Sequence, residues 1–99
     1  MTDLRELLAA NMKFHRKNTG ISQAKLAEKV NTATNYIAMI ETGRKFPSTQ
    51  MLEKIAFALN IDTPELFSAK ALHMETAEQL QKDILLDLQK IITKKINHL

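Results

Sequence analysis

A stretch of uncharged residues between positions 31 and 40 is the part of this chain best suited to recognising another molecule by direct contact. If the stretch is helical and Ile37 faces the core, its outward and flanking side chains are Thr34, Asn35, Ala38 and Met39. An asparagine can form two hydrogen bonds with an adenine, a threonine hydroxyl can donate or accept one, and alanine or methionine can contact a thymine methyl group. A solvated helix face would normally carry lysine and glutamate. The absence of charge therefore favours a surface that reads base edges in double-stranded DNA.

Groups that could hold DNA phosphates surround this stretch. Arg44 and Lys45 follow it directly, and Tyr36 on its flank can offer a hydroxyl. Gln23 falls in the first turn of the helix expected before it, where free backbone N–H groups and the positive end of the helix dipole favour an anion. We therefore expect these four residues to be phosphate contacts.

Two residues of opposite charge, Arg16 and Glu41, should point toward the edge of the core. Arg16 extends the apolar stripe of the first helix by one turn, and Glu41 lies four residues beyond Ile37. An unpaired charge in such a place would be costly. The pattern therefore predicts a structural ion pair that ties the first helix to the base-reading helix.

Helix-starting and helix-ending residues divide the first two thirds of the chain into five short helices. We expect them from Leu4 to about Lys17, from Ser22 to Asn31, from about Ala33 to Thr42, from Pro47-Ser48 through Leu59, and from Thr63-Pro64 through Phe67. The predicted N-caps are Thr2 or Asp3 (in a capping box with Glu6), Ser22 and Thr63. No window alternates at period two for long enough to form a strand, so the chain is predicted to be all-α.

The second and third helices are separated by a tight turn at Asn31, a residue that tolerates left-handed backbone. Their apolar stripes include Ala27, whose small side chain permits close helix crossing. Two such helices form a helix-turn-helix, with residues 33–42 as the recognition helix in the major groove. Residues 1–68 are accordingly interpreted as the DNA-binding domain.

A sixth, amphipathic helix is expected in residues 69–99, because Thr76 and Gln79 fit a capping box and no helix breaker follows before Asn97. Its apolar face is roughly 160° wide on a helical projection, broader than the seam of a two-stranded coil. The face consists of Ala77, Leu80, Ile84, Leu85, Leu88, Ile91, Ile92 and Ile96. Such a helix must dock on something, either as a lid on its own domain or partly across a second subunit. We favour the second arrangement and treat 69–99 as a dimerisation element, which would give a near-palindromic binding site.

Composition restricts the functional classes. Ninety-nine residues allow a single domain, and the net charge of +3 permits nucleic-acid binding. There is no cysteine, the longest apolar runs are five residues, and the start of the chain lacks the features of a signal peptide. His15, His73 and His98 are scattered. We expect a cytoplasmic protein without a metal, a cofactor, a membrane contact or enzymatic activity.

The chain resembles the Cro and phage-repressor class of helix-turn-helix proteins, the XRE family, over about Leu4 to Phe67. The matching positions are Gly20-Ile21-Ser22-Gln23, Leu26-Ala27, Val30, Ile37, Ile40-Glu41, Gly43, Pro47-Ser48, Leu52, Ile55-Ala56 and Leu59. Asn31 replaces the usual turn glycine, and Met39 is apolar for a base-reading position. The resemblance implies a transcriptional regulator in which Gln23 contacts phosphate and Arg16 pairs with Glu41. It also leaves a second interpretation open, an antitoxin-like or accessory module whose C-terminal helix binds a different protein.

Overall fold

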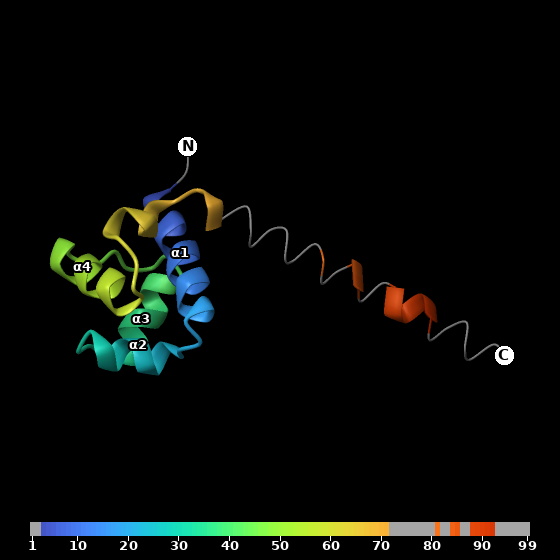
Figure 1. Cartoon of the computed structure of the whole chain (residues 1–99), viewed down its shortest axis with the longest axis horizontal. Helices are drawn as coiled ribbons and strands as arrows, with labels where there is room; N and C mark the ends of the chain where they lie inside the picture. The colour runs from blue at the N-terminus through green and yellow to red at the C-terminus, as the bar shows by residue number, and fades with distance from the viewer. Residues whose placement is uncertain (1–2, 72–80, 82–83, 86–87, 93–99) are drawn as a thin grey trace.

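The computed structural model describes residues 3–71, 81, 84–85 and 88–92 of the chain. Its elements are α1 (Leu4–Asn18), α2 (Gln23–Lys29), α3 (Thr34–Glu41), α4 (Thr49–Ala58) and the 3-10 helix η1 (Thr63–Phe67). No strand occurs among these described residues, and the predicted all-α fold with five helices is confirmed. In Figure 1, α1 stands beside α3, and α4 lies on the side of the domain away from α1.

Side-chain caps start three of the helices. At the start of α1, Asp3 Oδ1 accepts a hydrogen bond from the N–H of Arg5 at 2.9 Å. At the start of α2, Ser22 Oγ accepts one from the N–H of Lys25 at 3.0 Å. At the start of α4, Ser48 Oγ accepts one from the N–H of Met51 at 3.1 Å. The capping box with Glu6 is wrong, because the cap of Asp3 goes to the N–H of Arg5. The prediction of Thr63 as an N-cap is also wrong. Asp62 is the N-cap, and its carbonyl accepts from the N–H of Glu65, the short-range bond of a 3-10 turn.

The turn between α2 and α3 depends on a residue with left-handed backbone. Asn31 has φ of 57°, as its position in the sequence predicts, and the carbonyl of Ala27 accepts from the N–H of Thr32 at 2.9 Å. Asn60 adopts the same conformation after α4, with φ of 58°. Asparagine at the end of a helix therefore serves twice in the role that glycine usually fills.

One apolar core joins all five helices. Its largest fully buried side chains are Leu8 and Met12 of α1, Leu26 of α2, Ile37 and Ile40 of α3, Ile55 of α4, Leu59 after it and Leu66 of η1. Ala27 is also buried, and its small side chain allows α2 to approach α3 closely. Because Ile37 and Ile40 are both fully buried, the rotation of α3 about its own axis is fixed by packing.

A buried asparagine fastens the end of this domain to α1. Asn11 is 1% exposed, and its Nδ2 donates to the carbonyl oxygens of Leu7 and Ser68, each at 2.8 Å. Ser68 Oγ accepts in turn from the N–H of Lys70, where helical backbone begins again, and Ala71 is buried. The chain therefore leaves the domain after Ser68, whose position is fixed by its hydrogen bond to Asn11 of α1.

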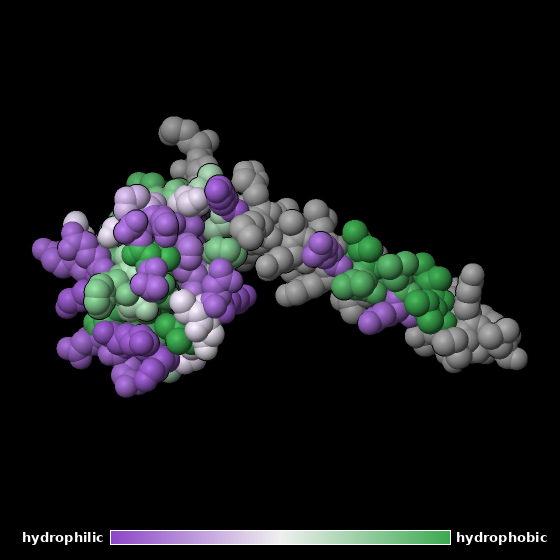
Figure 2. Space-filling view, in the orientation of Figure 1, coloured by the Kyte–Doolittle hydropathy of each residue, from purple (hydrophilic) through white to green (hydrophobic). Residues whose placement is uncertain are grey.

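The described residues of the C-terminal segment are helical and carry exposed apolar side chains. Ile84, Leu85, Leu88, Ile91 and Ile92 are 50–58% exposed. Figure 2 shows the apolar atoms of this segment gathered together. The remaining residues of the predicted apolar face, Ala77, Leu80 and Ile96, lie outside the described residues, as does the proposed cap Thr76. None of the helices described is both long and apolar enough to span a bilayer.

Candidate nucleic-acid interface

The candidate interface is built on α3, which α1 and α2 hold from behind. Ile37 and Ile40 anchor the inner side of α3 in the core, and Leu26 and Ala27 of α2 are buried with them. The helical period places residues 34, 35 and 38 away from that buried side. This arrangement turns the start of α3 toward solvent while its back remains fixed.

The outward side of α3 is uncharged, as the sequence indicates. Thr34 and Asn35 are exposed, whereas Ala38 and Met39 are half-buried. Ala33 is the N-cap and makes no side-chain hydrogen bond, so the first turn of α3 is not closed by a cap. The side chains with the most freedom to contact a partner are therefore Thr34 and Asn35, with Ala38 and Met39 providing an apolar border.

Two cations lie directly beyond the end of α3. Gly43 has φ of 76°, and the N–H groups of Arg44 and Lys45 both donate to the carbonyl of Met39, at 2.9 and 3.2 Å. These bonds fold the chain back over the last turn of the helix and leave both cationic side chains exposed. Such groups can contact phosphates beside the surface that α3 presents.

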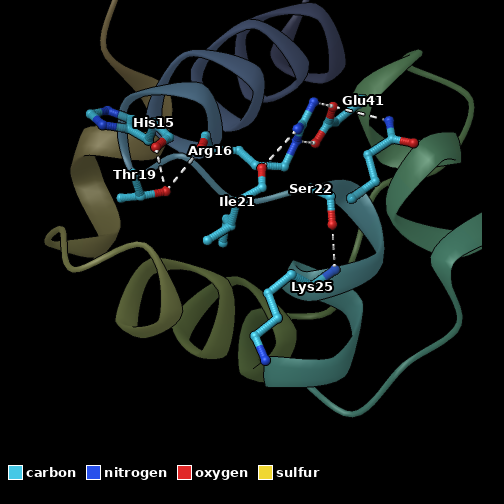
Figure 3. Close-up of polar contacts among 8 residues, drawn as sticks. His15, Arg16, Thr19, Ile21, Ser22, Lys25 and Glu41 are labelled. Carbon is cyan, nitrogen blue, oxygen red and sulfur yellow. Dashed lines mark hydrogen bonds and ion pairs between the residues drawn. The ribbon is translucent and has the colours of Figure 1, made fainter.

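The predicted ion pair between Arg16 and Glu41 is present and bidentate. Arg16 Nε donates to Glu41 Oε2 at 2.8 Å, and a terminal nitrogen of the guanidinium donates to Glu41 Oε1 at 3.0 Å. The other terminal nitrogen donates to the carbonyl of Ile21 at 3.1 Å. Figure 3 shows the guanidinium lying between Glu41 and the loop at Ile21. The carboxylate is 2% exposed and Arg16 is 14% exposed, so the pair is sheltered from water.

Gln23 makes a contact that the sequence did not suggest. Its Nε2 donates to Glu41 Oε1 at 3.2 Å, so the first residue of α2 joins the ion pair between α1 and α3. No local pattern could have shown this, because 18 residues separate the partners. The amide has a second N–H, and its oxygen is not used in this contact.

Tyr36 lies where it can serve both packing and binding. It is half-buried, and its ring packs against the core cluster. Packing against the core is sufficient to explain a tyrosine ring at this position. The predicted phosphate contact therefore involves only the hydroxyl group. Within the described ranges, no group of three or more metal-ligating side chains occurs.

Comparison with known proteins identifies the architecture. Residues 9–72 match a family model described as a helix-turn-helix domain. The chain is 33% identical over 84 residues to the immunity repressor protein of Bacillus phage phi105, covering 81% of this chain and 58% of that protein. It is 34% identical over 65 residues to the transcriptional regulator SinR of Bacillus subtilis, covering 65% of this chain and 59% of SinR. The match thus spans less than two thirds of either relative.

A solved structure gives the same result. The hypothetical transcription factor NHTF from Neisseria superimposes with a TM-score of 0.67 at 31% identity, covering 75% of this chain and 85% of the other. Residues 9–72, which the family model matches, contain the whole α2–turn–α3 unit described above. The chain therefore belongs to the XRE family of helix-turn-helix transcription regulators, and not to a family of enzymes.

Proposed function

We propose that this protein binds double-stranded DNA sequence-specifically as a small dimeric transcriptional regulator, with α3 in the major groove. One observation carries the proposal: a rigidly held helix presents an uncharged hydrogen-bonding surface and is followed at once by two exposed cations. DNA recognition needs both kinds of group, the first for base edges and the second for phosphates. We also propose that the protein acts in the cytoplasm, as expected from its sequence.

In the proposed complex, Asn35 is the principal base-reading residue. Its side chain is exposed near the start of α3, and an asparagine can bond an adenine through two hydrogen bonds. Thr34 beside it contributes a single hydroxyl. Ala38 and Met39 are half-buried, so only part of each side chain can contact DNA. That exposed apolar part is suited to contact with a thymine methyl group.

Phosphate contacts are assigned to Arg44, Lys45, Gln23 and the hydroxyl of Tyr36. The first two are exposed at the end of α3. Gln23 is held by Glu41, so the direction of its second amide N–H is defined before DNA arrives. A donor already held in its binding direction loses less conformational entropy on binding.

Dimerisation is assigned to residues 69–99. The described apolar side chains of this segment are about half exposed, including Leu88 at 50% and Ile92 at 56%. Leaving several such side chains in water is unfavourable, and a second copy would cover them. A two-fold dimer would place two recognition helices about 34 Å apart and require half-sites about 10 base pairs between centres.

The experiment that tests this function is a selection of genomic DNA fragments by the purified full-length protein, followed by titration at several salt concentrations. We expect a near-palindromic consensus and a steep loss of affinity with salt, because phosphate binding releases counterions. Replacing Arg44 and Lys45 by alanine should weaken binding to all sequences alike and reduce the slope of log K against log salt by roughly 2 per subunit. Replacing Arg5 and Lys17 removes the same charges at exposed positions of α1, outside both the proposed DNA contacts and the proposed dimerisation segment, and serves as the matched control.

The outcomes separate the two interpretations of the C-terminal segment. Failure to select any DNA, or salt-independent binding, would contradict the proposed function. Selection of single half-sites by a monomer would contradict the dimer and favour a different protein as the partner of the C-terminal face.

A further inference from the structure

Phe46 is a large apolar side chain that is partly exposed beside the proposed phosphate contacts. It follows Arg44 and Lys45 in the chain and is 43% exposed. The other exposed large apolar side chains of residues 3–71 are Leu4 on α1 and Phe57 on α4. Of these three, only Phe46 adjoins cations assigned to phosphates. Its position therefore suggests a contact with DNA that neither the base-reading nor the phosphate-binding residues provide.

The backbone at Phe46 directs its side chain toward the surface. A residue that precedes proline is restricted to extended backbone, and Phe46 precedes Pro47. Successive side chains along extended backbone point to opposite sides. Because Pro47 is buried, the side chain of Phe46 lies on the outer side of the loop between α3 and α4.

The ring of Phe67 supports one side of the Phe46 ring. The two ring centroids are 6.2 Å apart, and the ring planes are tilted by 33°. Phe67, the last residue of η1, is partly buried and packs against the core cluster. The Phe46 ring therefore rests on the domain with one side and is open to solvent on the other. A ring held in this way loses little conformational entropy when its open side is covered.

We propose that the open side of Phe46 packs against a deoxyribose of the DNA backbone, next to the phosphates that Arg44 and Lys45 contact. This inference rests on the proposed function. Sugars alternate with phosphates along each strand, and their carbon atoms are the apolar part of the backbone. A phenyl ring has no hydrogen-bonding group with which to bind a phosphate or to read the polar edge of a base. An apolar side chain that directly follows two cations in an exposed loop is therefore suited to the neighbouring sugar.

The salt dependence of binding distinguishes this contact from those of the cations. Counterion release depends on how many phosphates are neutralised, so an apolar contact with a sugar does not change the slope of log K against log salt. Phe46→Ser in the full-length protein should lower the affinity for the selected DNA by roughly tenfold at every salt concentration, with the slope unchanged. Arg44→Ala should instead reduce the slope by roughly 1 per subunit.

Two further variants separate contact with DNA from a structural role. Phe46→Leu keeps an apolar side chain and should retain most of the affinity that Phe46→Ser loses. Leu4→Ser removes an exposed apolar side chain from α1, outside the proposed DNA contacts, and serves as the matched control. Urea unfolding and titration of the DNA-binding fraction of each preparation correct the affinities for any loss of folded protein.

The outcomes distinguish this contact from the proposed function as a whole. If the parent binds DNA with a steep salt dependence and Phe46→Ser binds equally well, the contact is wrong and the proposed function stands. A loss accompanied by a smaller slope would also overturn the contact, because Phe46 would then act by positioning the cations. A changed base preference in a repeated selection would overturn it too, since the ring would then lie against a base. A parent that binds no DNA would contradict both proposals.

Discussion

Arg16→Ala is expected to be one of the most destabilising single substitutions in this protein. The substitution leaves the Glu41 carboxylate, which is 2% exposed, with the amide of Gln23 as its remaining side-chain donor. In the folded domain this carboxylate is almost inaccessible to water, and Arg16 is the only cation with which it forms an ion pair among the described residues. The reverse substitution, Glu41→Ala, leaves Arg16 with its bond to the carbonyl of Ile21 and 14% exposure.

The magnitudes follow from these surroundings. Removing one partner of a buried pair typically costs about 3–5 kcal/mol, against about 0–1 kcal/mol for an exposed pair. We expect the loss of stability from Arg16→Ala to lie at the upper end of the range for a buried pair, because the substitution leaves the nearly inaccessible charge of Glu41 without its partner. Glu41→Ala belongs at or below the lower end, because a long guanidinium side chain can turn its charged end toward water. Replacing Arg16 by Met and Glu41 by Leu together should cost less than Arg16→Ala, since no charge is then stranded.

Urea unfolding of the four proteins, followed by circular dichroism, measures these differences. With a slope of about 1–3 kcal/mol per molar urea, a loss of 4 kcal/mol moves the midpoint by roughly 1–4 M. The order of stability should be parent, then Glu41→Ala, then Arg16→Ala, with the apolar double variant above Arg16→Ala. If the free energies of unfolding of both alanine variants lie within about 1 kcal/mol of that of the parent, the pair behaves as an exposed one. The reasoning from burial would then be refuted.

Three further predictions concern the remaining contacts. Asn35→Ala should cost ~1–3 kcal/mol on the selected site and relax the preference at one base pair per half-site, with a smaller effect for Thr34→Ala; an unchanged consensus in a repeated selection would remove Asn35 from the base-reading surface. Leu88→Glu with Ile92→Glu should give protein that loses binding to a full operator far more than it loses helix content, measured by gel shift and circular dichroism; a parent that sediments as a monomer with and without DNA would contradict this. Asn11→Leu should destabilise the domain by about 1–3 kcal/mol in urea unfolding, because the carbonyl of Ser68 loses its partner in a sheltered place; a neutral result would show that water replaces the amide.

The parts of the fold that the sequence predicted correctly are those set by local chemistry. Ser22 caps α2 as predicted, because a hydroxyl at that place can reach an N–H three residues on. The helix predicted to start at Pro47-Ser48 begins with a cap of the same kind at Ser48. Asn31 forms the turn because few residues other than glycine accept its backbone conformation. The start of η1 was predicted one residue late, because Pro64 fits the second position of the first turn as well as the first.

Contacts between distant segments could not be predicted in the same way. Asn11 and Ser68 are 57 residues apart, and their bond depends on how η1 packs against α1. The bond from Gln23 to Glu41 likewise depends on the angle between α2 and α3. The pairing of Arg16 with Glu41 was the exception. Both charges were expected at the edge of the core, where an unpaired charge is costly, and few other charged residues were expected there to pair with them.

These contacts explain how a small domain can hold a recognition helix by one end. Glu41 in the last turn of α3 is bound to Arg16 of α1 and Gln23 of α2, whereas Thr34 and Asn35 in the first turn are exposed. The contacts of Glu41 and the buried Ile37 determine the direction and rotation of α3. The exposed residues in its first turn therefore do not hold the helix in place. In the proposed complex, substitutions at the exposed end should therefore change which sequence is bound, whereas substitutions at the fixed end should change whether the domain is folded.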